Sequence, residues 1–214
     1  MESSGTDVSL ESGMSAPEVS VSMDLEPQRI PRRKEVLNLL TGIFFKTVYF
    51  LDPELTKCVI VGFVKNRGNS LGVIFKGRKG AVFLPSSTFN QFAVHFNEIT
   101  VALEKREKVM FREDDFEIKV SNVFGRQHIF LYDGEHTLTL NTAEWTQFVN
   151  NLPPLYRELR NRFLQEDLVG RYIIDILDSN EEFVTPPEGL SPYITDRLFD
   201  EVQLFKRWPN GGSG

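Results

Sequence analysis

Residues 57–105 follow an order of local patterns that recurs later in the chain, and this repetition narrows the folds that the chain can adopt. Two strand-like runs flank a turn, a basic turn leads to a third run, and an amphipathic helix with apolar residues spaced 3, 4, 3 and 4 follows. A shift of 56 positions places apolar residues of this unit on apolar residues further on, in the pairs Val82 and Leu138, Leu84 and Leu140, Phe89 and Trp145, Phe92 and Phe148, and Phe96 and Leu152. Identities are few, so chance similarity is an alternative, but the shared order and spacing favour an internal duplication.

Each copy of the unit starts with one more strand-like run, Phe44–Leu51 in the first copy and Val109–Arg112 in the second. We therefore predict an α+β fold of two β-β-β-β-α repeats, in which curved antiparallel sheets are backed by helices. The two repeats are expected to form an intramolecular pseudo-dimer, followed by a C-terminal helical extension. The predicted boundaries are a disordered acidic tail with a basic linker (1–35), repeat one (36–108), repeat two (109–165), the C-terminal extension (166–209) and a flexible end (210–214).

The helix of repeat two carries signals that the helix of repeat one lacks. Asn141 and Glu144 fit a capping box at its start, and Pro153-Pro154 must end or kink it, because neither proline offers an amide hydrogen. The helix of repeat one is predicted to be unbroken. Further on, residues 168–177 are compatible with a strand or a short helix, and Ser191-Pro192 is predicted to start a last helix.

The formal net charge of −6 is unevenly distributed. Residues 1–28 carry −6 and residues 166–214 carry −6, so the middle, 29–165, carries +6. Six of its basic residues, and no acidic one, lie between Lys57 and Gly80. This cluster favours a polyanionic partner in spite of the acidic whole chain.

Signals for catalysis, metal binding or a membrane span are poor. The single cysteine, Cys58, excludes a disulfide within the chain and a cysteine-based zinc site. The three histidines lack the spacing of metal ligands, and Gly72–Arg78 imitates a phosphate-binding loop but has Arg where Lys belongs. No apolar run approaches the length of a membrane span. We therefore expect no enzymatic activity, no cofactor, no metal and no membrane partner.

Strand alternation predicts which face of each sheet is free of helices. In repeat two, Phe116, Ile118 and Val120 should face the helix. A shift back by 56 positions then assigns Ile60, Gly62, Val64, Val82 and Leu84 to the helix side of repeat one. Its open face is predicted to carry Val59, Val61, Phe63, Lys65, Lys76 and Phe83. Rings between lysines suit single-stranded nucleic acid, although the C-terminal segment or another subunit could instead cover this face.

Four strands and a helix, with the segment Lys76-Gly-Arg-Lys-Gly-Ala-Val-Phe-Leu84 before the helix, resemble the positive cofactor four family of transcriptional coactivators. The duplicated plan is similar to the Pur proteins, and the Whirly proteins share the general unit. The resemblance implies single-stranded DNA or RNA binding across the curved sheet, with Lys65, Arg67, Lys76, Arg78 and Lys79 as phosphate contacts and Phe63 and Phe75 as stacking groups. Alternation nevertheless places Phe75 on the helix side. The basic residues Lys57, Lys119 and Arg126 complete the predicted site.

The leading hypothesis is a non-enzymatic single-stranded nucleic-acid-binding protein of transcription or replication, located in the nucleus or another intracellular nucleic-acid compartment. Its acidic tails could recruit transcription or replication proteins, and two chains could pair as a homodimer. The acidic turn Gly134-Glu-His136 replaces the basic turn in repeat two, so repeat two is expected to serve mainly as the pseudo-dimer partner. The alternative is a protein-interaction adaptor that retains the fold without binding nucleic acid.

Overall fold

The computed structural model describes residues 41–78, 80–113, 116–180 and 183–207. The predicted tail and linker (1–35), the end (210–214) and Lys79 lie outside the described residues.

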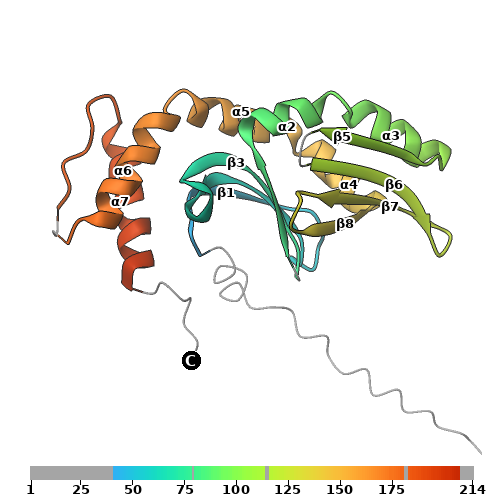
Figure 1. Cartoon of the computed structure of the whole chain (residues 1–214), viewed down its shortest axis with the longest axis horizontal. Helices are drawn as coiled ribbons and strands as arrows, with labels where there is room; N and C mark the ends of the chain where they lie inside the picture. Colours follow the sequence, from blue (N-terminus) through green and yellow to red (C-terminus); the bar gives the residue numbers. More distant parts are fainter. Residues whose placement is uncertain (1–40, 79, 114–115, 181–182, 208–214) are drawn as a thin grey trace, which may run out of the picture. The chain divides into compact units, whose positions relative to one another are not determined.

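Eight strands form two separate antiparallel sheets, each with its four strands in sequence order. Sheet one consists of β1 (Ile43–Phe50), β2 (Cys58–Val64), β3 (Ser70–Lys76) and β4 (Ala81–Pro85), and sheet two of β5 (Val109–Glu113), β6 (Phe116–Val123), β7 (Arg126–Tyr132) and β8 (Thr137–Asn141). Helices follow each sheet (Figure 1). The predicted α+β fold with two four-stranded antiparallel sheets followed by helices is confirmed.

The helices after both sheets are broken in two. Repeat two has α4 (Thr142–Asn150) and α5 (Leu152–Phe163), with the predicted capping box present and the two prolines in the first turn of α5. Repeat one has α2 (Ser86–Ala93) and α3 (Phe96–Lys105), so the prediction of an unbroken helix is wrong. The apolar stripe concealed this break, because the rings of Phe92 and Phe96 still meet across the tight turn, with centroids 4.7 Å apart.

Two more helices complete the chain, α6 (Glu166–Asp178) and α7 (Pro192–Arg207). The segment 168–177, which was compatible with a strand or a helix, is therefore helical, and the last helix starts at Pro192 as predicted. The two helices pack against each other, with α6 against β3 and α7 against β1 (Figure 1).

Strand β1 contains a bulge that side chains from the helices hold in place. Phe45 has a φ of 48°, and its amide donates to the carboxylate of Glu201 at 2.6 Å. Arg197 donates to the carbonyl of Lys46 at 2.7 Å, and the guanidinium groups of Arg162 and Arg197 lie 4.7 and 4.8 Å from the centre of the Phe45 ring. Helix α7 thus satisfies backbone groups on the edge strand of sheet one, which would otherwise be open to pairing.

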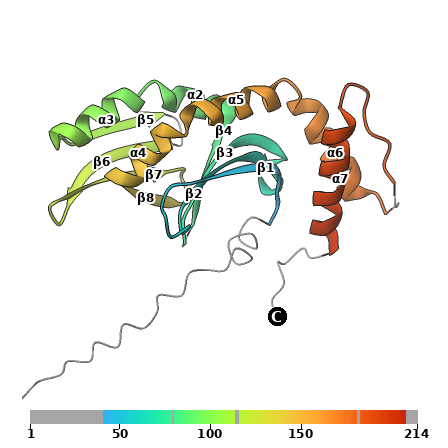
Figure 2. The ribbon, with the colours of Figure 1, turned by 180° about the vertical axis from the view of Figure 1, so that it is seen from behind.

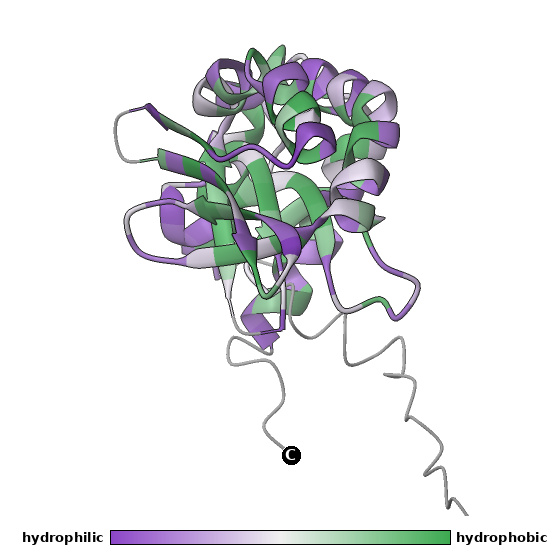
Figure 3. Cartoon of the chain, turned by 90° about the vertical axis from the view of Figure 1, so that its right-hand side faces the viewer, coloured by the Kyte–Doolittle hydropathy of each residue, from purple (hydrophilic) through white to green (hydrophobic). Residues whose placement is uncertain are grey.

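One buried core joins the two repeats. Helices α2, α3 and α5 run along the top of Figures 1 and 2, with α5 of repeat two against β2 and β3 and α2 of repeat one against β5, while α4 packs against β7 and β8. In the core, the ring of Phe75 lies 5.0 Å from that of Phe148, and the ring of Phe92 lies 5.3 Å from that of Phe116. Hydrophobic residues concentrate in the strands, while hydrophilic residues occupy the turns and the outer sides of the helices (Figure 3). Each repeat therefore buries its apolar face partly against the other.

The assignment of faces in sheet one is partly wrong. In β4, Val82 and Leu84 pack into the helix-side core as predicted. In β2, however, Ile60 belongs to a cluster on the opposite face. The residues of β2 that pack into the helix-side core are Val59, Val61 and Phe63. The ring of Phe63, predicted to stack on bases, is therefore fully buried.

A difference in turn length explains this error. Strands β3 and β4 match β7 and β8 at the offset of 56, since the pair Val73 and Leu84 corresponds to the pair Ile129 and Leu140. Five residues, 65–69, separate the paired ends of β2 and β3, but only two separate those of β6 and β7, so β2 matches β6 at an offset of 59. Because side chains alternate along a strand, this odd difference of three residues exchanges the two faces of β2.

Candidate nucleic-acid interface

The helix-free face of sheet one is apolar and largely buried. Cys58, Ile60 and Ile74 form a separate cluster there with Ile43, and all four side chains are at most 9% exposed. The ring of Phe83 lies over Gly72, 2.4 Å from the position that a Cβ would take. The four residues at the centre of this face offer no ring for stacking, while Phe50 and Phe83 on the edge strands are half-buried. Phe75 lies on the other side, fully buried in the core.

Burial also changes the chemistry of the cysteine on this face. Desolvation raises the pKa of the Cys58 thiol to about 11, an effect that Asp52 reinforces and Lys76 opposes. A neutral thiol with such a pKa is a poor nucleophile at neutral pH. Cys58 is thus buried and unreactive.

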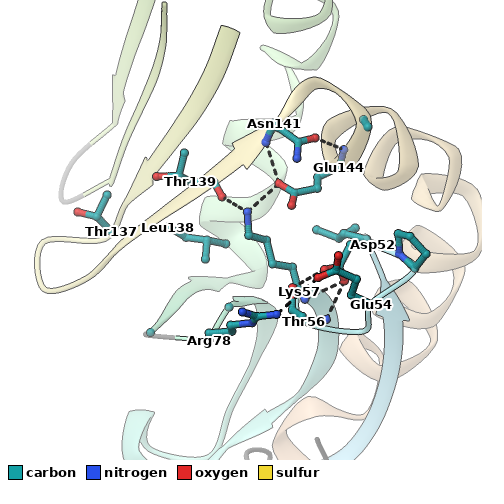
Figure 4. A pocket seen from close by; sticks show the side chains of 15 residues that line it. Asp52, Glu54, Thr56, Lys57, Arg78, Thr137, Leu138, Thr139, Asn141 and Glu144 are labelled. Carbon is teal, nitrogen blue, oxygen red and sulfur yellow. Dashed lines mark hydrogen bonds and ion pairs between the residues drawn. The ribbon is translucent and has the colours of Figure 1, made fainter. Parts of the chain in front are cut away.

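Lys57 connects the two repeats and does not face solvent freely. Its ammonium group donates to the carboxylate of Glu144 at 2.8 Å and to the carbonyl of Thr139 at 2.7 Å (Figure 4). Glu144 also accepts from the amide of Asn141 as part of the capping box of α4. The charge of Lys57 is therefore already compensated by a carboxylate of the same chain.

The pocket around Lys57 has a volume of about 680 Å³ and is lined by both repeats (Figure 4). The exposed guanidinium of Arg78 lies at its border, 3.5 Å from the carboxylate of Glu54. Both acidic and basic groups line this pocket, so it does not present a uniformly positive surface.

The acidic turn of repeat two lies against sheet one. Asp133 accepts from the amide of Phe83 at 3.0 Å, and Glu135 forms an ion pair of 2.7 Å with Arg67. Together with Lys76, these residues line a hollow of about 390 Å³. Lys65 is directed elsewhere, with its ammonium group 4.5 Å from the centre of the Phe205 ring. The basic cluster of repeat one is consequently neutralised in part by residues of the same chain.

The helix-free face of sheet two is different, because its strands alternate between buried apolar and accessible side chains. One row of neighbours across the four strands consists of Met110, Lys119, Phe130 and Thr139. Met110 is 62% exposed, Lys119 is exposed and the Phe130 ring is half-buried. A thioether, an ammonium group and a ring thus lie side by side on an accessible surface.

Strand β7 extends this accessible face along its length. Its alternate residues Arg126, His128, Phe130 and Tyr132 share one side of the strand. The Tyr132 ring is 41% exposed, and its hydroxyl donates to the carbonyl of Gly134 at 2.6 Å, which fixes the ring in place. One side of β7 therefore presents a guanidinium and an imidazole group followed by two rings.

The charges around β6 and β7 are of one sign over a considerable length. No acidic residue lies between Glu117 and Asp133, while the basic residues Lys119 and Arg126 do. Glu117 itself is paired with Arg112 at 2.6 Å. The open face of sheet two, defined as the helix-free side of β5 to β8, is the better electrostatic match for a polyanion.

The structure separates the predicted site residues into groups. Phe63 and Phe75 are buried, while Lys57, Arg67 and Arg78 are held in ion pairs. Lys119 and Arg126 lie exposed on the open face of sheet two. Four neighbours on that face were not among the predicted site residues, although alternation in β5 and β7 marks them: Met110, His128, Phe130 and Tyr132.

Among the described residues, every helix is too short or too polar to cross a bilayer, and no three His, Cys, Asp or Glu side chains gather as a metal site would require. None of the family models, curated proteins or solved structures compared with the chain matches it.

Proposed function

We propose that this chain binds single-stranded nucleic acid across the open face of sheet two. The observation that carries the proposal is the accessible row of Met110, Lys119 and Phe130 on neighbouring strands, continued along β7 by Tyr132 and Arg126. An unpaired base has two free faces that can stack on a ring, and its phosphate can meet an ammonium or guanidinium group.

The proposed interface lies in repeat two, whereas the resemblance implies an interface in repeat one. In repeat one the predicted stacking rings, Phe63 and Phe75, are buried, and Lys57, Arg67 and Arg78 are paired with carboxylates. The shared core and the packing of α5 on sheet one support the intramolecular pseudo-dimer. In this arrangement repeat one acts as the scaffold that supports repeat two. Action in transcription or replication, without catalysis and in the nucleus, remains part of the proposal on the strength of the resemblance.

The test is fluorescence anisotropy of a labelled oligo-dT strand, a matching RNA strand and a DNA duplex, each at two salt concentrations. We expect binding of the single strands that weakens with salt, because each neutralised phosphate releases counterions. The double variant Lys119→Met/Arg126→Met should weaken binding and lower the salt dependence, whereas the matched variant Arg157→Met/Arg160→Met should not. Arg157 and Arg160 are exposed on α5, in the helix layer on the other side of the sheets.

Binding that the first double variant leaves intact would refute the open face of sheet two as the interface. Failure of all three nucleic acids to bind at low salt would refute the function itself and favour the protein-interaction adaptor.

A further inference from the structure

The β6–β7 hairpin extends beyond the rest of sheet two (Figures 1 and 2). Strand β5 pairs with β6 only as far as Val120, and β8 pairs with β7 only from His128 onward. The pairs beyond these points, up to Val123 and Arg126, join only β6 and β7. The chain therefore forms a two-stranded ribbon whose tip is the turn Phe124-Gly125.

The phenylalanine at the tip is unusual in two respects, its exposure and its backbone conformation. Phe124 is 101% exposed, so its ring gains nothing from burial. Phe124 and Gly125 also have φ values of 49° and 79°, the left-handed pair of a hairpin turn that favours Asn-Gly. A bulky residue with positive φ is strained, and fixed strain is concentrated at functional sites. A side chain that is strained and exposed in the free protein is explained by a ligand that covers it.

The charge around the tip indicates which ligand this is. Arg126 adjoins the turn on the open face, in line with His128 and Phe130, and the acid-free stretch between Glu117 and Asp133 includes the whole ribbon. A nucleic-acid strand that lies along the rings of β7 therefore reaches Phe124 at the end of the sheet. A ring beside a guanidinium group suits a nucleobase and its phosphate.

We propose that Phe124 is a terminal stacking residue: it binds the unpaired base at one end of the nucleic acid that lies on the open face of sheet two. This inference rests on the proposed function. The ribbon extends the binding track past the four-stranded sheet, and it adds a contact that needs a base free of its complementary strand.

The test is the substitution Phe124→Asn in the full chain. Asparagine removes the ring and suits the left-handed turn, so stability and binding should change in opposite directions. We expect the melting temperature to rise or stay unchanged. Affinity for an oligo-dT of about ten nucleotides, a length within the site sizes of single-strand-binding OB folds, should fall about fivefold or more, as when one stacking ring is lost. The matched control is Leu164→Asn, which removes a side chain that is 77% exposed after α5.

A second measurement locates the contact. The fluorescent base 2-aminopurine is placed at the first, middle or last position of the same strand, since stacking quenches its emission. We expect Phe124→Asn to remove the quenching at one terminal position only.

Three results would overturn the inference. A lower melting temperature with unchanged affinity would make Phe124 a structural residue. Unchanged affinity and quenching, with binding by the parent chain intact, would leave the proposed function standing without this contact and would assign the ring to a protein partner. If the parent chain binds no strand at all, the proposed function and this inference fail together.

Discussion

Sheets one and two have the same strand order, and each is followed by its own pair of helices. Their helix-free faces nevertheless differ in exposure and polarity. In sheet one this face is a buried apolar cluster around Ile60, while in sheet two it is an accessible surface around Lys119 and Phe130. A repeated fold therefore does not imply a repeated binding site. The side chains of the second face decide which copy can meet a ligand.

The strand sequences explain the difference. Strand β2, Cys-Val-Ile-Val-Gly-Phe-Val, is apolar on both faces, and a strand of this kind is stable only when both are covered. Gly62 and Gly72 make this possible, because a Cβ at these positions would lie 2.8 Å from the Ile43 side chain and 2.4 Å from the Phe83 ring. Strand β6, Phe-Glu-Ile-Lys-Val-Ser-Asn-Val, alternates and leaves one face to the solvent.

The comparison is tested most strongly by removing one ring from each sheet. Phe75→Ala should lower the free energy of unfolding by about 3–5 kcal/mol, because a buried ring is lost from the shared core. Phe130→Ala should cost much less, about 1 kcal/mol, and should weaken oligonucleotide binding instead. Chemical denaturation and anisotropy measure the two effects. Equal stability losses would show that Phe130 is a core residue and that its face of sheet two is not open.

Much of this arrangement could be predicted from the sequence. The strands, the capping box of Asn141 and Glu144 and the break before Pro153 each follow from a local signal. The faces of β2 could not be deduced in the same way. The offset of 56 holds for the helices but not across the turn before β3, which is three residues longer than its counterpart. Because side chains alternate along a strand, this odd difference reverses the two faces of β2.

The site was harder to predict than the fold, because charge in the sequence does not show which charges are paired. Six basic residues and no acid between Lys57 and Gly80 indicate a polyanion site. The chain, however, brings Glu144, Glu135 and Glu54 to this cluster from outside it. Only tertiary contacts reveal such neutralisation.

The burial of the second face of sheet one around Cys58 can be measured through the Cys58 thiol. Its pKa of about 11 in the folded chain lies above the value of about 8.5 for an unfolded one, so the folded state binds the proton more tightly. The resulting stabilisation is fully present below about pH 8.5, and it is lost as pH rises toward 11. The loss should approach about 2–3 kcal/mol at the upper end.

The comparison that isolates this effect is between the parent chain and Cys58→Ala, because tyrosines and lysines titrate in the same range in both. Unfolding free energies measured from pH 7 to 10.5 should converge upward of pH 8.5, with the parent chain losing its advantage. Parallel curves would mean that water reaches Cys58, and that the second face of sheet one is as open as that of sheet two.

The smallest expected effect separates a structural lysine from a binding lysine. Lys57→Met keeps the apolar stem but removes the ammonium group from Glu144, whose side chain is 8% exposed. The unfolding free energy should fall by about 1–2 kcal/mol, as for a partly buried charged hydrogen bond. The salt dependence of oligonucleotide binding should not change, because Lys57 meets a carboxylate and not a phosphate.

Lys119→Met should have the opposite effects. Stability should stay within about 0.5 kcal/mol, as for an exposed surface residue. The salt slope should fall by about 0.7, the contribution of one contact on a single strand. If Lys57→Met lowers the slope by that amount as well, the strand also reaches the pocket between the repeats, and the two sheets share the binding that we assign to one.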